Sequence, residues 1–347
     1  MPQLQPIGKL LVTFSLGLVF VIITCLSMLK SLIVKGPKKV FGVTKRLKRP
    51  DLLDDPSLGE HKFARMKHIT LHYVEKGDQN KPLMLFIHGF PEFWYSWRHQ
   101  LKEFSDTHRC VAVDMRGYNE SDKPHGVENY SIDKLSADIK ELVLYLGYEK
   151  CLLVAHDWGA VVAYAVVDVY PEILDSLIIC NGPYGRAFAK VLQKSRAQFF
   201  KSWYTMMFQW PLIAEFYCRS GDLNFLNACF TGKKMGAKAG SFSDDDIEAY
   251  KYVFRNFEDL TPPINYYRAA GRYRPGYAAP KTVCVRSLII WGTEDGALGK
   301  EIPEVTREYF DDLTIQYIEG GSHWIQNEEP DQVNQLIREF ISGKKDD

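Results

Sequence analysis

The chain has 347 residues, of which 46% are apolar and 25% are charged. This balance is typical of a protein with a large buried core, and it excludes a disordered tail, a collagen-like chain and a small disulfide-stabilised protein. The 43 basic and 43 acidic side chains cancel, but residues 1–50 contain nine of the basic ones and no acidic one. The remaining residues therefore carry 34 basic against 43 acidic side chains, and this net negative charge disfavours nucleic-acid binding.

Residues 10–29 form an uncharged, mostly apolar stretch between Lys9 and Lys30. About 20 apolar residues span the hydrocarbon core of a bilayer. A cleaved signal peptide is the alternative, but its apolar part has roughly 7–15 residues and precedes a site of small residues. Here Lys30-Ser-Leu-Ile-Val-Lys35 follows instead. We therefore expect a short tail at 1–9, a retained transmembrane helix at 10–29 and a basic juxtamembrane linker at 30–60.

The side of the membrane on which the rest of the chain lies is less clear from the sequence. Eight of the nine basic side chains follow the apolar stretch closely, and the positive-inside rule then favours the cytosol. Seven cysteines without a CxxC pair fit reduced thiols in the same compartment. Two N-x-S sequons, at Asn119 and Asn129, would fit the opposite side, so the topology stays open.

After residue 68, short apolar runs alternate with helical patterns. This order predicts an α/β fold with a mostly parallel sheet covered by helices on both faces. The expected strands are 69–74, 83–88, 110–114, 151–156, 177–181, 288–291 and 314–318, and the expected helices are 94–104, 132–146, 159–170, 303–310 and 331–340.

One segment, residues 184–280, interrupts the alternation because it is rich in aromatic residues and helix formers and contains no convincing strand. It falls between the fifth and sixth strands of the regular pattern. We expect a helical lid inserted into the α/β core, which is then divided into a first part at 61–183 and a second part at 281–347.

The run Leu-Leu-Val-Ala-His-Asp-Trp-Gly at residues 152–159 joins an apolar strand to a helix. It has the context of a nucleophile elbow, a strained strand-to-helix turn that raises one side chain above the sheet. The raised residue is Asp157, and no G-x-S-x-G motif occurs in the chain, which disfavours a serine esterase. The alternative is that Asp157 only caps the following helix.

The loop at residues 88–92 (His-Gly-Phe-Pro-Glu) favours the catalytic interpretation of Asp157. Gly and Pro after a strand are common in ordinary turns. In the nucleophile-elbow architecture, however, this loop supplies one backbone N–H of the oxyanion hole, and the residue after the nucleophile supplies the other. The expected donors are the N–H groups of Phe90 and Trp158.

Two further residues appear in the order nucleophile, acid, histidine that such triads follow. Asp295 follows the strand expected at 288–291, and His323 lies in a Gly-rich loop after the strand expected at 314–318. Glu294 is the alternative acid beside Asp295. We expect His323 to be the general base and Asp295 to orient it.

Together, residues 88–92, Asp114-Met-Arg-Gly-Tyr118, His156-Asp-Trp-Gly159 and Gly321-Ser-His-Trp324 resemble the epoxide hydrolases of the α/β-hydrolase fold. The resemblance covers roughly residues 55–342, and the tract 55–97 is similar to that of the membrane-anchored animal members, epoxide hydrolases 3 and 4. One departure is Ala160, where many relatives have glycine. The resemblance implies a cofactor-independent enzyme of the endoplasmic reticulum membrane that converts small lipophilic epoxides to vicinal diols through an ester on Asp157.

An epoxide differs from a halide as a leaving group because the departing alkoxide needs a proton, which a phenol can supply. Tyr204 and Tyr267 have surroundings similar to those of the family's paired lid tyrosines, although Tyr266 lies beside Tyr267 and all of these residues could be ordinary lid aromatics. The alternatives for the whole chain are a haloalkane or fluoroacetate dehalogenase with the same Asp-His-Asp machinery, and a catalytically idle membrane scaffold. We expect no metal site and no nucleotide cofactor, because the sequence contains no metal-ligand spacing and no Gly-rich phosphate loop.

Overall fold

Eight strands form one central sheet in the order β10-β9-β7-β6-β4-β5-β3-β2. In the computed structural model, which describes residues 3–343, the pairs from β10 to β5 are parallel, whereas β3 and β2 run antiparallel to their neighbours. The strands are β2 (Glu60–Arg65), β3 (Thr70–Lys76), β4 (Leu83–Ile87), β5 (Arg109–Val113), β6 (Cys151–His156), β7 (Leu174–Cys180), β9 (Ser287–Gly292) and β10 (Leu313–Ile318). The predicted mostly parallel sheet is confirmed.

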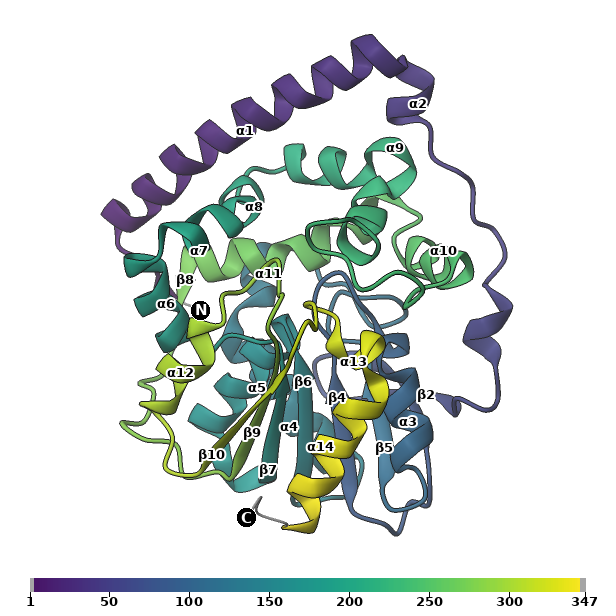
Figure 1. The fold of residues 1–347 in the computed structure, drawn as a ribbon, viewed down its shortest axis with the longest axis vertical. Coiled ribbons are helices and arrows are strands. Elements are labelled where there is room, and N and C mark those ends of the chain that lie inside the picture. The colour runs from purple at the N-terminus through teal and green to yellow at the C-terminus, as the bar shows by residue number, and fades with distance from the viewer. Residues whose placement is uncertain (1–2, 344–347) are drawn as a thin grey trace.

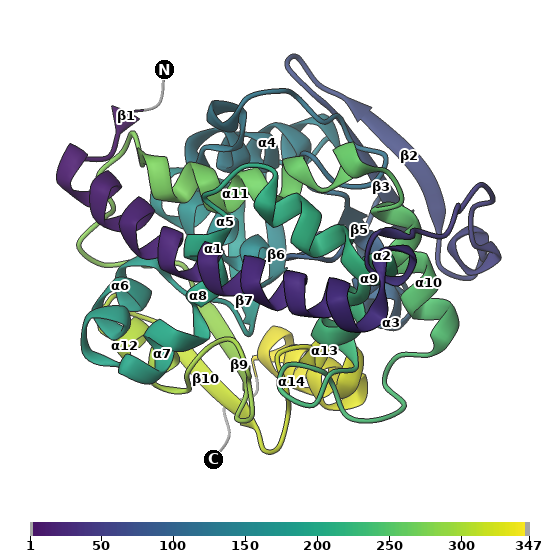
Figure 2. The ribbon, with the colours of Figure 1, turned by 90° about the horizontal axis from the view of Figure 1, so that it is seen from above.

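Helices cover both faces of this sheet, which explains why its central strands β4, β5 and β6 are buried along their whole length and read as continuous apolar runs. Helices α3 and α14 pack together on one face, and α4 and α5 pack together on the other (Figure 2). The core helices are α3 (Arg98–Phe104), α4 (Ile132–Tyr145), α5 (Trp158–Val169), α12 (Glu301–Arg307), α13 (Ile325–Glu328) and α14 (Pro330–Ser342).

A group of helices between β7 and β9 lies over one edge of the sheet (Figure 1). At this edge the parallel strands β4, β6, β7, β9 and β10 all end, and loops that follow such carboxyl ends form the usual ligand crevice of α/β sheets. We refer to these helices as the lid: α6 (Gly185–Lys194), α7 (Arg196–Lys201), α8 (Trp203–Met207), α9 (Ile213–Phe230, interrupted at residues 220–223), α10 (Asp244–Val253) and α11 (Thr261–Arg272).

The long N-terminal helix α1 (Ile7–Lys35) lies along the outer side of the lid (Figures 1 and 2). Gly17 permits this close packing, because a Cβ at that position would lie 2.7 Å from the carbonyl oxygen of Met206. Phe20 packs against Trp203 with ring centroids 6.2 Å apart. The opposite side of α1 exposes apolar side chains, and the helix is long and apolar enough to cross a membrane.

The structure differs from the sequence-based expectation at three elements. Strand β2 was not predicted because its sequence is mostly polar and only Ala64 in it is buried. Within the segment expected to lack strands, the two-residue strand β8 (Tyr273–Arg274) pairs with β1 (Gln3–Leu4), and such a short long-range pair has no local pattern. Helix α1 exceeds residues 10–29 because its flanking lysines are good helix formers.

The N-terminal helix ends at Gly36, which has a φ of 79° that favours glycine. A short helix, α2 (Pro37–Phe41), follows it within the expected linker. Residues 1–2 of the expected tail and residues 344–347 of the expected second core part lie outside the described residues.

Candidate active site

Asp157 lies at the turn between β6 and α5, with φ 48° and ψ −115°. A positive φ is strained for a residue with a Cβ, and such strain concentrates at functional sites. The turn is possible because neighbouring glycines lack side chains: a Cβ at Gly89 would lie 2.4 Å from the Cβ of Asp157, and one at Gly159 would lie 2.3 Å from the carbonyl oxygen of Ile87. The sequence therefore folds locally so that the Asp157 side chain points out of the sheet edge.

The two expected oxyanion-hole residues both adjoin Asp157. The backbone N–H of Phe90 donates to Asp157 Oδ1 at 2.8 Å. Trp158 is the first residue of α5, where backbone N–H groups have no partner within the helix. The N–H of Phe90, in the loop after β4, thus donates directly to the carboxylate of Asp157. The second backbone donor, the N–H of Trp158, belongs to the residue that follows Asp157 in the chain.

His323 connects Asp157 to Asp295. Its Nδ1 lies 2.7 Å from Asp295 Oδ2, and its Nε2 lies 3.5 Å from Asp157 Oδ2. His323 and Asp295 are buried, with 2% and 4% of their surfaces exposed. Glu294 is exposed, so Asp295 is the acid that contacts the imidazole. The structure therefore brings together three residues that are separated by up to 166 positions in the chain.

Asn181 positions Asp295 and was missed by the sequence analysis. Its Nδ2 donates to Asp295 Oδ2 at 2.6 Å, and its Oδ1 accepts from the N–H of Gly292 at 2.9 Å. The other Asp295 oxygen accepts from the N–H groups of Ala297 and Leu298. The feature that could have identified Asn181 is its position directly after an apolar strand. It has a positive φ of 38°, which Asn tolerates better than most residues.

A second buried pair, Glu92 and His156, supports the loop that carries His323. His156 Nδ1 lies 2.6 Å from Glu92 Oε2, and His156 Nε2 lies 2.8 Å from the carbonyl oxygen of His323. The imidazole of His156 thereby links the carboxyl group of Glu92 to the backbone of the His323 loop. These residues belong to the motifs quoted above, but nothing in their spacing indicated that they contact each other.

The pKa shifts of the three central groups reflect their mutual charges. Burial alone would raise the pKa of Asp157, but the hydrogen bond and charge of His323 outweigh it and hold the pKa below its ordinary value. The same balance lowers the pKa of Asp295. Burial would lower the pKa of His323, yet the charges of Asp295 and Asp157 raise it from 6.5 to about 10. At neutral pH the site therefore contains an imidazolium between two carboxylates.

The two expected proton donors lie together in the lid. The rings of Tyr204 and Tyr267 are 5.7 Å apart, and Tyr267 packs on Trp158 at 4.9 Å. Burial and then the charges around Asp157 raise the pKa of both phenols above the ordinary value, so both are protonated at neutral pH. Tyr266 points elsewhere, because its hydroxyl donates to the carbonyl of Arg116 at 2.7 Å.

The chain is similar to proteins of known family. A family model described as the alpha/beta hydrolase fold matches residues 82–330. Epoxide hydrolase 1 of Caenorhabditis elegans is 45% identical over 300 residues, which cover 86% of this chain and 73% of that protein. Epoxide hydrolase 4 of Mus musculus is 41% identical over 312 residues, covering 88% and 86%. The crystal structure of Bacillus megaterium epoxide hydrolase in complex with an inhibitor has a TM-score of 0.75 and 32% identity, and covers 81% of this chain and 100% of that chain.

The row of three charges predicts how His323 titrates. In the wild-type chain its imidazole should lose its proton near pH 10 rather than near 6.5, because two carboxylates stabilise the charged form. Asp157→Asn removes one carboxylate and keeps the shape, so the pKa of His323 should fall. Nitrogen-15 chemical shifts of the imidazole over a pH series measure both values. Titration of wild-type His323 near 6.5 would contradict the assigned electrostatics.

Proposed function

Because the chain belongs to the epoxide hydrolases of the α/β-hydrolase fold, we propose that it converts lipophilic epoxides to vicinal diols through an ester on Asp157. The resemblance and enzyme class predicted from the sequence are confirmed, which favours this function over a dehalogenase or an idle scaffold. The observation that supports the proposal is one carboxylate that contacts a backbone donor and an imidazolium, with the ring of Tyr267 against Phe90 and Trp158 and the ring of Tyr204 beside it.

The first step opens the epoxide. A carboxylate oxygen of Asp157 attacks one ring carbon, and the electron pair of the breaking C–O bond goes to the epoxide oxygen. That oxygen takes a proton from Tyr204 or Tyr267, since an alkoxide is a poor leaving group without one. The low pKa of Asp157 supports its role as nucleophile, because the carboxylate needs no separate base to be ionised.

Formation of the ester also prepares the second step. It removes the negative charge of Asp157, one of the two charges that raise the pKa of His323. The imidazolium can then give up its proton. This proton replaces the one that Tyr204 or Tyr267 gave to the epoxide oxygen. The same residue that is charged in the resting enzyme thereby becomes a neutral base after the epoxide has opened.

The second step hydrolyses the ester. Neutral His323 takes a proton from water, and the hydroxide oxygen bonds to the carbonyl carbon of the ester. The N–H groups of Phe90 and Trp158 stabilise the resulting oxyanion. When the intermediate collapses, the diol oxygen leaves with the proton from His323, and the new carboxyl proton of Asp157 returns to the imidazole.

The substrate class follows from the side chains around Asp157. Phe90 packs against Phe208 and Tyr267 at ring-centroid distances of 5.7 and 5.3 Å, and Trp158 adds a further ring. Apolar and aromatic walls with few polar groups favour lipophilic ligands. We therefore infer that the substrate is a small lipophilic epoxide, and that the lid excludes bulk water from the ester.

The proposed membrane location rests on α1 and the basic residues that follow it. We propose that α1 anchors the chain as a single-pass helix in the endoplasmic reticulum membrane, with the enzyme on the cytosolic side favoured by the positive-inside rule. In the structure Phe14 and Phe20 of the same helix pack against Trp210 and Trp203, so insertion exchanges these contacts for lipid contacts. An N-glycan on Asn129 would instead place the enzyme in the lumen.

The ester mechanism predicts a trapped intermediate. His323→Gln removes the base for the second step but leaves Asp157 able to attack, so the alkyl-enzyme should accumulate. Intact mass spectrometry should then show one added substrate mass per chain, located on the peptide that contains Asp157. A variant that leaves both substrate and enzyme mass unchanged would contradict the role given to His323, and Asp157→Asn serves as the unreactive control.

The lid tyrosines should act on the epoxide oxygen rather than as packing aromatics. The double change Tyr204→Phe and Tyr267→Phe keeps both rings, so stability should stay nearly unchanged while epoxide opening is almost abolished. Each single change should slow opening by up to roughly 10²–10³-fold, the value of one oxyanion donor. Single-turnover ester formation measures this effect.

The adjacent Tyr266→Phe is the matched control for that experiment, because its hydroxyl bonds only to a carbonyl of the core. It should cost about 1 kcal/mol of stability and should leave ester formation close to wild type. Near-wild-type opening by the double variant would exclude the proton-donor role. Halide release by the double variant would favour a dehalogenase.

Membrane binding should depend on the exposed apolar side of α1. Val19→Lys with Ile23→Lys places two charges on that side, where the side chains are 54% and 56% exposed, and should release the chain from membranes. Each lysine costs about 2.5–3.5 kcal/mol at the centre of a bilayer. The control is Ile33→Lys with Val34→Lys, at the helix end where lysine reaches the interface. Flotation of vesicles measures binding, and retention of the first variant on membranes would contradict the anchor.

A further inference from the structure

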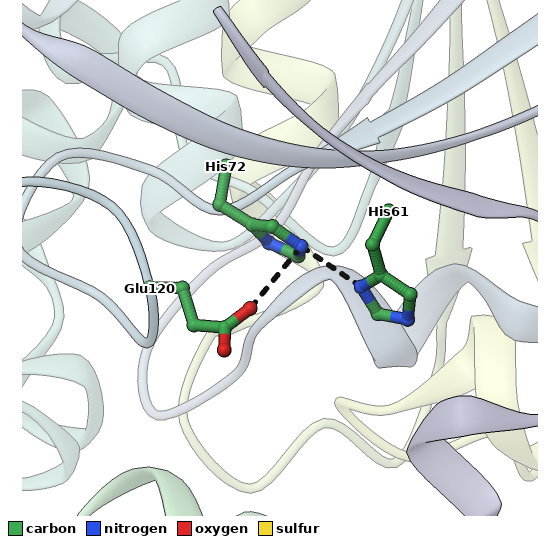
Figure 3. Close-up of side chains that lie close together, drawn as sticks. All are labelled: His61, His72 and Glu120. Carbon is green, nitrogen blue, oxygen red and sulfur yellow. Dashed lines mark hydrogen bonds and ion pairs between the residues drawn. The ribbon is translucent and has the colours of Figure 1, made fainter.

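His61, His72 and Glu120 converge at the side of the sheet where β2, β3 and the loop after β5 meet (Figure 3). His72 Nε2 lies 2.9 Å from His61 Nδ1 and 3.4 Å from Glu120 Oε2, and the three donor atoms lie within 4.8 Å of one another. His72 is buried, whereas Glu120 is exposed. The cluster is therefore open to solvent on one side.

The hydrogen bonds on the far sides of the two imidazoles determine which nitrogens carry protons. His72 Nδ1 lies 2.6 Å from Asp114 Oδ2, and this carboxylate also accepts from the Trp94 N–H. His61 Nε2 lies 2.8 Å from the carbonyl oxygen of Leu53. Both acceptors require a proton on the imidazole nitrogen that faces them.

With those protons assigned, the two nitrogens that face each other across 2.9 Å carry lone pairs whenever the imidazoles are neutral. Two lone pairs at that distance repel; the Nη2 group of Arg49, 3.3 Å from His61 Nδ1, relieves this repulsion at His61 but leaves the lone pair of His72 facing the same space. A proton shared by His61 and His72, with Glu120 as its counter-ion, is the alternative that the experiment below distinguishes. A metal ion uses all three donors, with one position left for water.

We propose that His61, His72 and Glu120 bind one divalent transition-metal ion of the zinc class. Two imidazoles and one carboxylate are a donor set that zinc commonly uses. Metal-bound histidines usually donate their other ring N–H to a carboxylate or a backbone carbonyl, and here Asp114 and Leu53 supply one of each. This site was not expected from the sequence, because its ligands are 11 and 48 positions apart and meet only in the fold.

Arg49 lies beside the cluster and is compatible with a cation there. Its Nη1 donates to Glu120 Oε1 at 2.7 Å, which leaves Oε2 directed at His72. Its charge is also balanced by Asp54 at 2.8 Å. Two carboxylates, those of Asp54 and Glu120, therefore pair with this guanidinium. With Asp114 on His72, the carboxylates around the cluster outnumber the one guanidinium, and the excess negative charge favours a divalent ion.

The position of the cluster suggests what the ion does. Arg49 and Leu53 belong to the segment that leads from α2 to β2, whereas His72 lies in β3 and Asp114 directly follows β5. Asp114 also holds the N–H of Trp94, in the loop that continues from Phe90. A bound ion would fasten the segment that follows the N-terminal helix to the same part of the core that positions the oxyanion-hole loop.

The test uses the untagged full chain in detergent, stripped with a chelator and then titrated with zinc chloride. We expect one zinc ion per chain by elemental analysis and a rise in the thermal midpoint, because a ligand that binds only the folded state stabilises it. Cobalt in place of zinc should give the visible absorption of a tetrahedral site. Metal content is independent of epoxide turnover, so its outcome is separate from that of the proposed function.

Glu120→Gln and His61→Gln test the ligands, and His68→Gln is the matched control because His68 is exposed in the turn between β2 and β3. The control should bind zinc like the wild type. Each ligand variant should bind at least about 10-fold more weakly, since changes even outside the ligand shell have that effect. Glu120 is exposed, so its variant should fold.

Two results would overturn the proposal. The first is the absence of bound zinc in the wild type, including the case in which nitrogen-15 spectra show only a proton shared by His61 and His72. The second is equal zinc binding by the wild type and both ligand variants.

Discussion

The interaction on which the active site depends is the buried contact of His323 with two carboxylates. Charges removed from water are costly unless they are paired and hydrogen-bonded, and each group here has partners. Asp295 receives three further hydrogen bonds, from Asn181, Ala297 and Leu298. Asn181 follows β7, Asp295 follows β9 and His323 follows β10. Because these buried groups need one another as partners, the three loops are held together at one edge of the sheet.

The same contact relates the resting enzyme to the proposed reaction. As long as Asp157 is ionised, it stabilises the imidazolium and keeps itself available as a nucleophile. Once it is esterified, that stabilisation disappears and the imidazole can accept a proton from water. In the proposed mechanism, one charge, lost and regained at Asp157, therefore selects which of the two steps the site can perform.

The fold and the central residues could be predicted from the sequence because their signals are local. Apolar runs such as Cys151–His156 are continuous, and Asp157 lies in a strand-turn-helix motif that can be read without knowing its neighbours. Asn181 and the Glu92–His156 pair could not be predicted, since their roles depend on contacts between loops far apart in the chain. Strand β2 was missed for a related reason, because an edge strand with one buried residue has no apolar pattern.

The ester on Asp157 is the central claim, and a single turnover in oxygen-18 water tests it most directly. With enzyme in excess over epoxide, the attacking oxygen of the first step comes from Asp157 and the water oxygen enters the carboxylate. The account predicts an unlabelled diol and one oxygen-18 atom in the peptide that contains Asp157. A diol that carries the label after one turnover, with an unlabelled Asp157, would show that water attacks the epoxide directly and would contradict the account.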